Sequence, residues 1–193
     1  GNATATDTLN INIIDDVPST GAADPTTVHE AGLASGSLPG DVAKPVSATG
    51  DLDLRVGADS TLASGYADVT FSAAQAGLTG LNLESGGTAL VYDLSNDDHT
   101  LTAYKVGDAQ IPDNEIFTVT LNDTASSDAD YTFTLKGPLD HGVDASKDLQ
   151  FAFDVTDGDG DTATSTFTVA VTDDGPLAVA NTDSVTEDAA TPA

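Results

Sequence analysis

The chain has 193 residues, enough for one or two domains with a sizeable core. Its formal net charge is −27, because 32 Asp and Glu residues face only five Lys and Arg. This balance argues strongly against nucleic acid as a partner, since binding phosphates requires Lys and Arg, and it argues equally against an anionic membrane surface. No apolar stretch approaches the length of about 20 residues that a membrane-spanning helix needs.

The acidic composition is that of a folded domain and not of a disordered tail. Hydrophobic residues make up 39% of the chain and alternate regularly with polar ones. Nearly all the acids are Asp, whose short side chain suits turns and cation sites. There is no Cys, so the chain cannot be cross-linked by disulfides, and bound metal is the obvious substitute.

Alternation with a period of two predicts strands along most of the chain, separated by turns rich in Gly, Asp, Asn and Ser. "SAAQAG" (72–77) favours a single helical turn. Short strands without a long helical pattern predict an all-β fold, an antiparallel β-sandwich. The predicted strands are 8–14, 67–72, 88–94, 115–121, 130–135, 149–155 and 162–171, with weaker candidates at 52–56 and 100–104.

The two ends of the chain repeat each other. "TATDTLNINIIDDVP" (4–18) aligns without a gap with "TATSTFTVAVTDDGP" (162–176). Such self-similarity indicates a tandem array. We therefore expect 1–18 to be the equivalent of the last strand and linker of a preceding repeat, 19–174 to form one β-sandwich module, and 175–193 to be a linker and the start of the next module.

One carboxylate cluster is the turn before the last predicted strand, in which Asp157, Asp159 and Asp161 alternate with glycines. It resembles the first half of an EF-hand loop but lacks that loop's Gly and Glu at later positions. Several carboxylate oxygens could still converge on one hard cation, and Ca²⁺ tolerates such irregular loops better than Mg²⁺. The alternative is a solvated Asp-Gly hairpin turn.

The other cluster is an Asp pair before a proline, present as Asp15-Asp16 and again as Asp173-Asp174. A strand over 162–172 should span about 30 Å, so its two ends lie at opposite poles of the sandwich. We expect the 157–161 turn to share a pole with Asp15-Asp16, and Asp173-Asp174 to face the next module. Each pole would then supply half of an interdomain cation site, and Glu30 could complete either one. The alternative is a solvated strand end that discourages edge pairing.

Other polar residues point less clearly to a site. The turn at 93–98 is either a hairpin loop or a metal site, and His141 is expected to hydrogen-bond a turn. No histidine spacing suggests zinc, and no G-x-S-x-G elbow is present. Paired carboxylates could serve a glycosidase, but the chain has no Trp and few other aromatic residues to stack on a sugar. We therefore expect no enzyme and no catalytic residues.

Several of these segments resemble a known repeat. "YTFTLKGPLDH" (131–141) and "LQFAFDVTDGDGDTATSTFTVAVTDDGP" (149–176) are similar to the tandem extender repeat of giant RTX-type adhesins exported by type I secretion, and 27–33 and 48–59 look like its opening. The resemblance implies an Ig-like or cadherin-like module with calcium at its junctions, on the surface of a bacterium. The RTX nonapeptide is absent, so this is not the calcium-binding β-roll that serves secretion.

The expected function is therefore a calcium-stabilised stalk module of a secreted adhesin that projects a distal ligand-binding region for cell adhesion and biofilm formation. Its expected partners are neighbouring modules of the same chain, with Ca²⁺ as the bound ion and with a monomeric state. Host or surface ligands would be bound by other regions. The alternative is a module that itself binds carbohydrate or peptide through a calcium-bridged loop.

Overall fold

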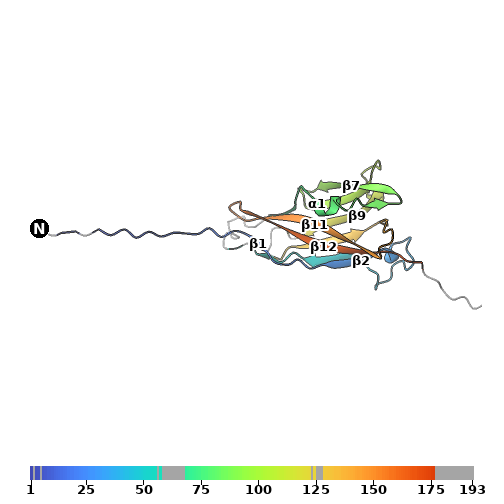
Figure 1. Cartoon of the computed structure of the whole chain (residues 1–193), viewed down its shortest axis with the longest axis horizontal. Helices are drawn as coiled ribbons and strands as arrows, with labels where there is room; N and C mark the ends of the chain where they lie inside the picture. Colours follow the sequence, from blue (N-terminus) through green and yellow to red (C-terminus); the bar gives the residue numbers. More distant parts are fainter. Residues whose placement is uncertain are drawn as a thin grey trace, which may run out of the picture.

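Two β-sheets packed face to face form the body of the protein (Figure 1). The computed structural model describes residues 1, 3–4, 6–55, 57, 68–122, 124 and 128–176. Its strands are β1 (Ser19–Thr20), β2 (Thr26–His29), β3 (Ser47–Asp51), β4 (Leu54–Arg55), β5 (Asp68–Phe71), β6 (Glu84–Ser85), β7 (Thr88–Ser95), β8 (Thr100–Lys105), β9 (Glu115–Asn122), β10 (Asp130–Leu135), β11 (Ser146–Thr156) and β12 (Thr162–Thr172). The helical turns are η1 (Glu30–Gly32), α1 (Ala76–Thr79) and η3 (Pro112–Asn114).

The larger sheet has six strands in the order β3-β10-β9-β8-β7-β6, and every neighbouring pair in it is antiparallel. The smaller sheet has four strands in the order β2-β12-β11-β5. β1 and β4 form a separate two-stranded ribbon. The predicted all-β sandwich is thus confirmed.

One pair departs from the predicted antiparallel arrangement, because β2 and β12 run parallel. Antiparallel neighbours are what hairpin connections produce, but β2 and β12 lie near opposite ends of the chain and no hairpin joins them. Their register aligns Val28 with Val171 and His29 with Thr172. Both strands consequently end at the same edge of the sheet.

The core lies between the sheets and is built by the alternation that predicted the strands. On β12, Phe167, Val169 and Val171 are at most 2% exposed, while the residues between them are less buried. The Phe167 ring stacks on Tyr131 of the opposite sheet, with ring centroids 3.9 Å apart. The Tyr131 hydroxyl donates a hydrogen bond to the Asp24 carbonyl at 2.6 Å. Burial of each large apolar side chain contributes about 1.5–3 kcal/mol.

Most predicted strands are present, with small shifts at their ends. β7 to β12 and β5 match predicted segments, and only Leu54–Arg55 of 52–56 is a strand among the described residues. The predicted helical turn lies slightly later, as α1. β1, β2, β3 and β6 were not among the predicted strands, and Glu30 begins the turn η1 directly after β2.

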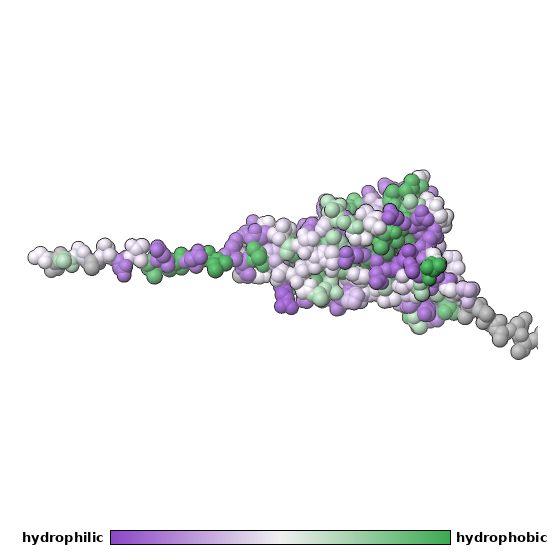
Figure 2. All heavy atoms as spheres, in the orientation of Figure 1, coloured by the Kyte–Doolittle hydropathy of each residue, from purple (hydrophilic) through white to green (hydrophobic). Residues whose placement is uncertain are grey.

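The predicted strand at 8–14 is wrong for this chain, because these residues are extended but belong to no sheet. Leu9, Ile11 and Ile13 align with the buried Phe167, Val169 and Val171, yet they are 83%, 76% and 87% exposed. Figure 1 shows the segment running away from the body, and Figure 2 shows hydrophobic atoms along it. An alternating sequence becomes a strand only when a neighbouring strand is available to pair with it.

The sheets extend from Ser19 to Thr172, within the range predicted for one module. Residues 177–193, assigned to the start of a next module, lie outside the described residues. None of the helices in the described ranges has the length and apolar character needed to cross a membrane.

Candidate metal-binding sites

The sandwich has two poles, and ligand-type side chains gather at each. We call the end at which residues 1–18 join the body the N-terminal pole, where the β11–β12 turn also lies (Figure 1). We call the end at which β12 finishes the C-terminal pole. The eleven residues of β12 separate the two.

At the N-terminal pole, the β11–β12 turn folds around the carboxylate of Asp157. Asp157 Oδ1 accepts hydrogen bonds from the backbone N–H groups of Gly160 (3.1 Å) and Asp161 (2.8 Å). The Asp157 N–H donates to the Asp161 carbonyl at 3.0 Å and closes the turn. Gly160 has φ +107°, a conformation that side-chain-bearing residues rarely adopt. The glycine of the DGDGD sequence therefore allows the turn to curl.

The second oxygen of Asp157 is the unusual feature of this turn. Asp157 is 4% exposed, and its Oδ2 atom is buried without a hydrogen-bond partner. Burial acts to raise its pKa, but the side chain of Asp159 and the N–H groups of Asp161 and Gly160 lower it more, so the pKa lies below its ordinary value. A charged carboxylate with an unpartnered buried oxygen is costly unless a ligand completes it.

Asp15 reaches this turn from the extended N-terminal segment. Carboxylate oxygens of Asp15, Asp159 and Asp161 lie within 4.8 Å of one another. The side-chain contact with Asp157, burial, and the charges of Asp157, Asp15 and Asp161 raise the pKa of Asp159. None of the ion pairs within the described ranges includes these carboxylates. The donor set is all oxygen, which fits Ca²⁺.

Asp16, which the sequence grouped with Asp15, lies toward a different partner. Its carboxylate faces Gly57, whose φ is +72°, and a Cβ atom at Gly57 would lie 2.6 Å from Asp16 Oδ2. The structure thus brings Asp15 into the group of converging carboxylates and leaves Asp16 beside the backbone that follows β4.

The C-terminal pole holds a group of different chemistry. Because β2 and β12 run parallel with His29 opposite Thr172, the next residue of each chain segment, Glu30 and Asp173, lies at the same edge. His141 joins them, and the ligand atoms of Glu30, His141 and Asp173 lie within 4.8 Å of one another. Glu30 is thus far along the sandwich from the Asp15 group, at the pole where the chain leaves.

The "GPLDH" motif builds this pole residue by residue. The Leu139 N–H donates to Glu30 Oε1 at 2.6 Å, and His141 Nε2 lies 3.2 Å from the same oxygen. Between them, Asp140 accepts hydrogen bonds from the N–H groups of Gly86 (2.8 Å) and Gly87 (2.6 Å) in the β6–β7 turn. The motif therefore ties the 137–145 loop to both sheets.

Glu30 and His141 are deeply buried, with side chains 4% and 1% exposed. Burial raises the pKa of Glu30 and the charge of Asp173 raises it further, while the Leu139 N–H and His141 act in the opposite direction; the pKa lies above its ordinary value. His141 Nδ1 is buried without a hydrogen-bond partner. His141 was expected to hydrogen-bond a turn, and its contact is instead with a buried carboxylate.

Asp174 is held within its own domain. Its two carboxylate oxygens accept hydrogen bonds from the Ser37 N–H at 2.8 Å and the Ser37 hydroxyl at 2.5 Å. Asp173 and Asp174 were expected to face a following module as a pair, and the structure separates their roles. Asp173 joins Glu30 and His141, and Asp174 fixes the exit of the chain to the loop after η1.

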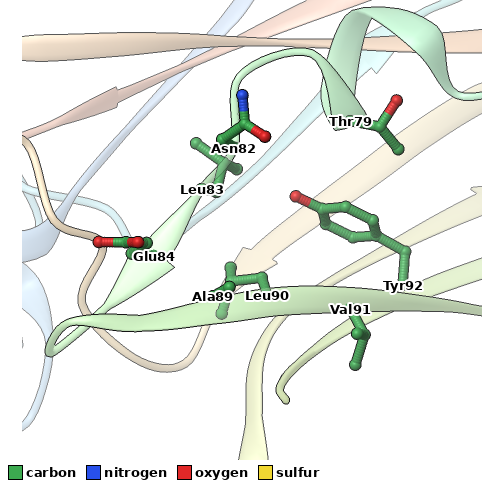
Figure 3. A pocket seen from close by; sticks show the side chains of 8 residues that line it. All are labelled: Thr79, Asn82, Leu83, Glu84, Ala89, Leu90, Val91 and Tyr92. Atoms are coloured by element: carbon green, nitrogen blue, oxygen red, sulfur yellow. The ribbon is translucent and has the colours of Figure 1, made fainter.

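A hollow of about 460 Å³ lies between the α1 turn and β7 (Figure 3). Its Glu84 end adjoins the loop of the C-terminal pole, because the Glu84 carbonyl accepts a hydrogen bond from the Asp140 N–H at 2.8 Å. Tyr92 points into it toward the side of Asn82 and Leu83, and Val91 points to the opposite face of β7. Its lining combines apolar and polar side chains. In the described part of the chain, neither group of converging metal-ligand side chains includes a residue of this hollow or of the 93–99 turn.

Comparisons with protein-family models, with curated proteins and with solved structures found no match for the chain.

Proposed function

We propose that this chain is a calcium-stabilised structural extender module of a secreted bacterial surface adhesin. Its role is mechanical, holding a distal ligand-binding region away from the cell for adhesion and biofilm formation. Neighbouring modules of the same chain are its partners, and it works as a monomer within that array.

The observation that carries the proposal is the meeting of Asp15 with Asp159 and Asp161. Asp15 lies outside the sandwich, in the segment that leads into it, and the other two belong to the β11–β12 turn. A divalent cation held by all three would fix the direction of the incoming segment relative to the body. Without the cation, the same carboxylates repel one another and favour separation.

The path of the chain supports a role in a linear array. The incoming segment and the end of β12 lie at opposite poles, so the body is a spacer between them (Figure 1). The repetition of 4–18 at 162–176 supports an upstream neighbour whose last strand is the 4–14 segment. The apolar side chains exposed there match the buried positions of β12, which is what such a strand requires.

We assign four residues to Ca²⁺ at the N-terminal pole: Asp15, Asp157, Asp159 and Asp161. The converging oxygens of Asp15, Asp159 and Asp161 would supply a hard, oxygen-only ligand set, completed by water or backbone carbonyls. We add Asp157 because its Oδ2 atom, in the same turn, is buried without a hydrogen-bond partner. The ion would add charge compensation and rigidity.

Thermal unfolding followed by circular dichroism tests this role. The full chain is measured in EDTA and then in excess Ca²⁺. At a Ca²⁺ concentration about 100-fold above the dissociation constant, linkage adds about 2.7 kcal/mol. For a domain of this size that raises the melting temperature by about 5–10 °C.

A matched pair of variants locates the effect. Asp159→Asn should lose most of the calcium-dependent rise, whereas Asp97→Asn should keep it. Asp97 is also an exposed turn aspartate, with φ +53°, a conformation that Asn tolerates. Equal calcium responses in the two variants would contradict the assignment.

A second candidate is a ligand-binding module, and the hollow beside Tyr92 favours it. Thr79, Asn82 and Glu84 offer polar groups to a carbohydrate or peptide, and Leu83 and Leu90 offer apolar contact. Glycan-array or peptide-library binding that Tyr92→Ala abolishes would favour this candidate. If the chain is only an extender, it should bind neither the glycan array nor the peptide library.

A further inference from the structure

We propose that Glu30, His141 and Asp173 form a second metal site, selective for a borderline divalent cation such as Zn²⁺ and distinct from the calcium site. This inference goes beyond the extender role and does not depend on calcium binding at the N-terminal pole. It rests on where three side chains from three parts of the chain meet.

The three residues come from separate elements. Glu30 begins η1 directly after β2, Asp173 follows β12, and His141 belongs to the loop between β10 and β11. Their ligand atoms lie within 4.8 Å of one another, a spacing that one metal ion can bridge. His141 Nε2 and Glu30 Oε1 are 3.2 Å apart, which suits two adjacent ligands of one ion.

The buried side chains of Glu30 and His141 lack a compensating cation among the described residues that surround them. Glu30 and His141 have lost almost all contact with water, and no Lys or Arg forms an ion pair with Glu30 in the described ranges. His141 Nδ1 is buried and makes no hydrogen bond. The Leu139 N–H and His141 are the hydrogen-bond partners of the buried Glu30 carboxylate, but neither a Lys nor an Arg compensates its charge in the described ranges. A divalent cation would supply the missing charge and a bond to the imidazole.

The donor set decides which cation fits. Ca²⁺ and Mg²⁺ take oxygen ligands, and an imidazole is a poor ligand for both. One imidazole with two carboxylates suits Zn²⁺ and related divalent ions. The sequence placed Glu30 and Asp173 among the calcium ligands, and the imidazole beside them favours a different metal. Because Asp173 is exposed, the fourth position faces solvent and would be filled by water or an external ligand.

The geometry also gives this site a structural consequence. The ion would link the end of β2, the "GPLDH" loop and the point at which the chain leaves the sandwich. It would thereby hold the exit of β12 to the body, as Asp174 already does through Ser37.

Zinc binding by the full chain tests the proposal. The protein is stripped with a chelator and titrated with ZnCl₂ in 1 mM Ca²⁺, which occupies oxygen-only sites. Calorimetry and metal analysis after dialysis should give one Zn²⁺ per chain. His141→Gln and Asp173→Asn should each weaken binding at least about tenfold. His99→Gln is the matched control, because His99 contacts one carboxylate, that of Asp68 at 2.9 Å, and should leave affinity unchanged.

Two further measurements make the result independent of folding. The circular dichroism spectrum of each variant must match that of the parent. If His141→Gln unfolds the C-terminal pole, Asp173→Asn serves as the test variant, because Asp173 is exposed. Zn²⁺ should also shift the imidazole NMR signals of His141 and not those of His99. Absence of zinc binding in the parent, or equal affinity in Asp173→Asn and His99→Gln, would overturn the proposal. Asp159→Asn should remove the calcium response while leaving zinc binding intact, so the two sites fail separately.

Discussion

Asp15 and Asp159 bring carboxylate oxygens to within 4.8 Å of each other although one belongs to the extended N-terminal segment and the other to the turn between the last two strands. Two carboxylates at this distance repel, and the pKa of Asp159 is raised by its contact with Asp157, by burial and by neighbouring charges that include Asp15. A proton taken up by Asp159, surrounding water or a bound cation can relieve this repulsion. The calcium proposal assigns this role to the cation.

The repeat provides a matched pair of core and surface substitutions. Phe167→Ala removes a ring that is 2% exposed and stacked on Tyr131, so the free energy of unfolding should fall by about 3–5 kcal/mol. Leu9→Ala, at the aligned position in the exposed segment, should change it by less than about 0.5 kcal/mol. Urea denaturation of both variants measures the difference. A large loss in Leu9→Ala would show that the segment packs on the body.

The hydroxyl of Tyr131 should stabilise the start of β2. It donates to the Asp24 carbonyl at 2.6 Å and lies 3.1 Å from Thr26 Oγ1. Tyr131→Phe keeps the ring stacking but removes the donor, and it should lower the free energy of unfolding by about 1 kcal/mol. Chemical denaturation checks this value. An unchanged stability would mean that water replaces the hydroxyl.

Asp140 should make a contribution to stability that depends on pH. Its pKa lies below the ordinary value because the N–H groups of Gly87 and Gly86 hydrogen-bond to the carboxylate. The unfolded chain then binds the proton more readily, so this stability is complete above the unfolded pKa and is lost as pH falls through the folded pKa. Because Asp140 is exposed and water screens its carboxylate, Asp140→Asn should cost at most about 1 kcal/mol at pH 7 and progressively less below about pH 4.

Denaturation of Asp140→Asn at several pH values tests this sign. Asp144→Asn, in the same loop and exposed, is the control and should show no such trend. A cost for Asp140→Asn that grows on acidification would show that the two glycine N–H groups do not favour the charged carboxylate.

The link between Asp174 and Ser37 should hold the exit of the chain in place. Ser37→Ala removes the hydroxyl donor but keeps the backbone N–H that donates at 2.8 Å. We expect a loss of about 1 kcal/mol, since the accepting group is charged but partly solvated. Hydrogen exchange should rise at the end of β12 in this variant and stay constant at the β11–β12 turn. Uniform exchange across β12 would contradict a local role.

The sequence predicted the strands of the core well because their apolar residues alternate, and in β12 this pattern coincides with burial at Phe167, Val169 and Val171. The same pattern gave a wrong strand at 8–14. Alternation shows that a segment favours an extended strand, but it does not show whether a neighbouring strand is present to pair with it. The short strands β1 and β6 have only two residues each, too few to show a period.

At the sites, the sequence predicted that Asp15 shares a pole with Asp159 and Asp161, and the structure brings these three together. The prediction depended on the repeat and on the length of the last strand. It missed His141 as a neighbour of Glu30 and Asp173. That contact depends on the parallel pairing of β2 with β12, which alternation does not encode. The "GPLDH" motif was the available signal, but its leucine N–H and histidine find their partner only in three dimensions.

Calorimetric titration of Ca²⁺ into the parent chain, Asp15→Asn and Asp7→Asn tests the central claim most directly. Asp7 lies in the same extended segment, and Asp15 is the residue of that segment that reaches Asp159 and Asp161. The account predicts at least about tenfold weaker binding for Asp15→Asn and parental affinity for Asp7→Asn. Parental affinity in Asp15→Asn would show that no cation joins the segment to the turn.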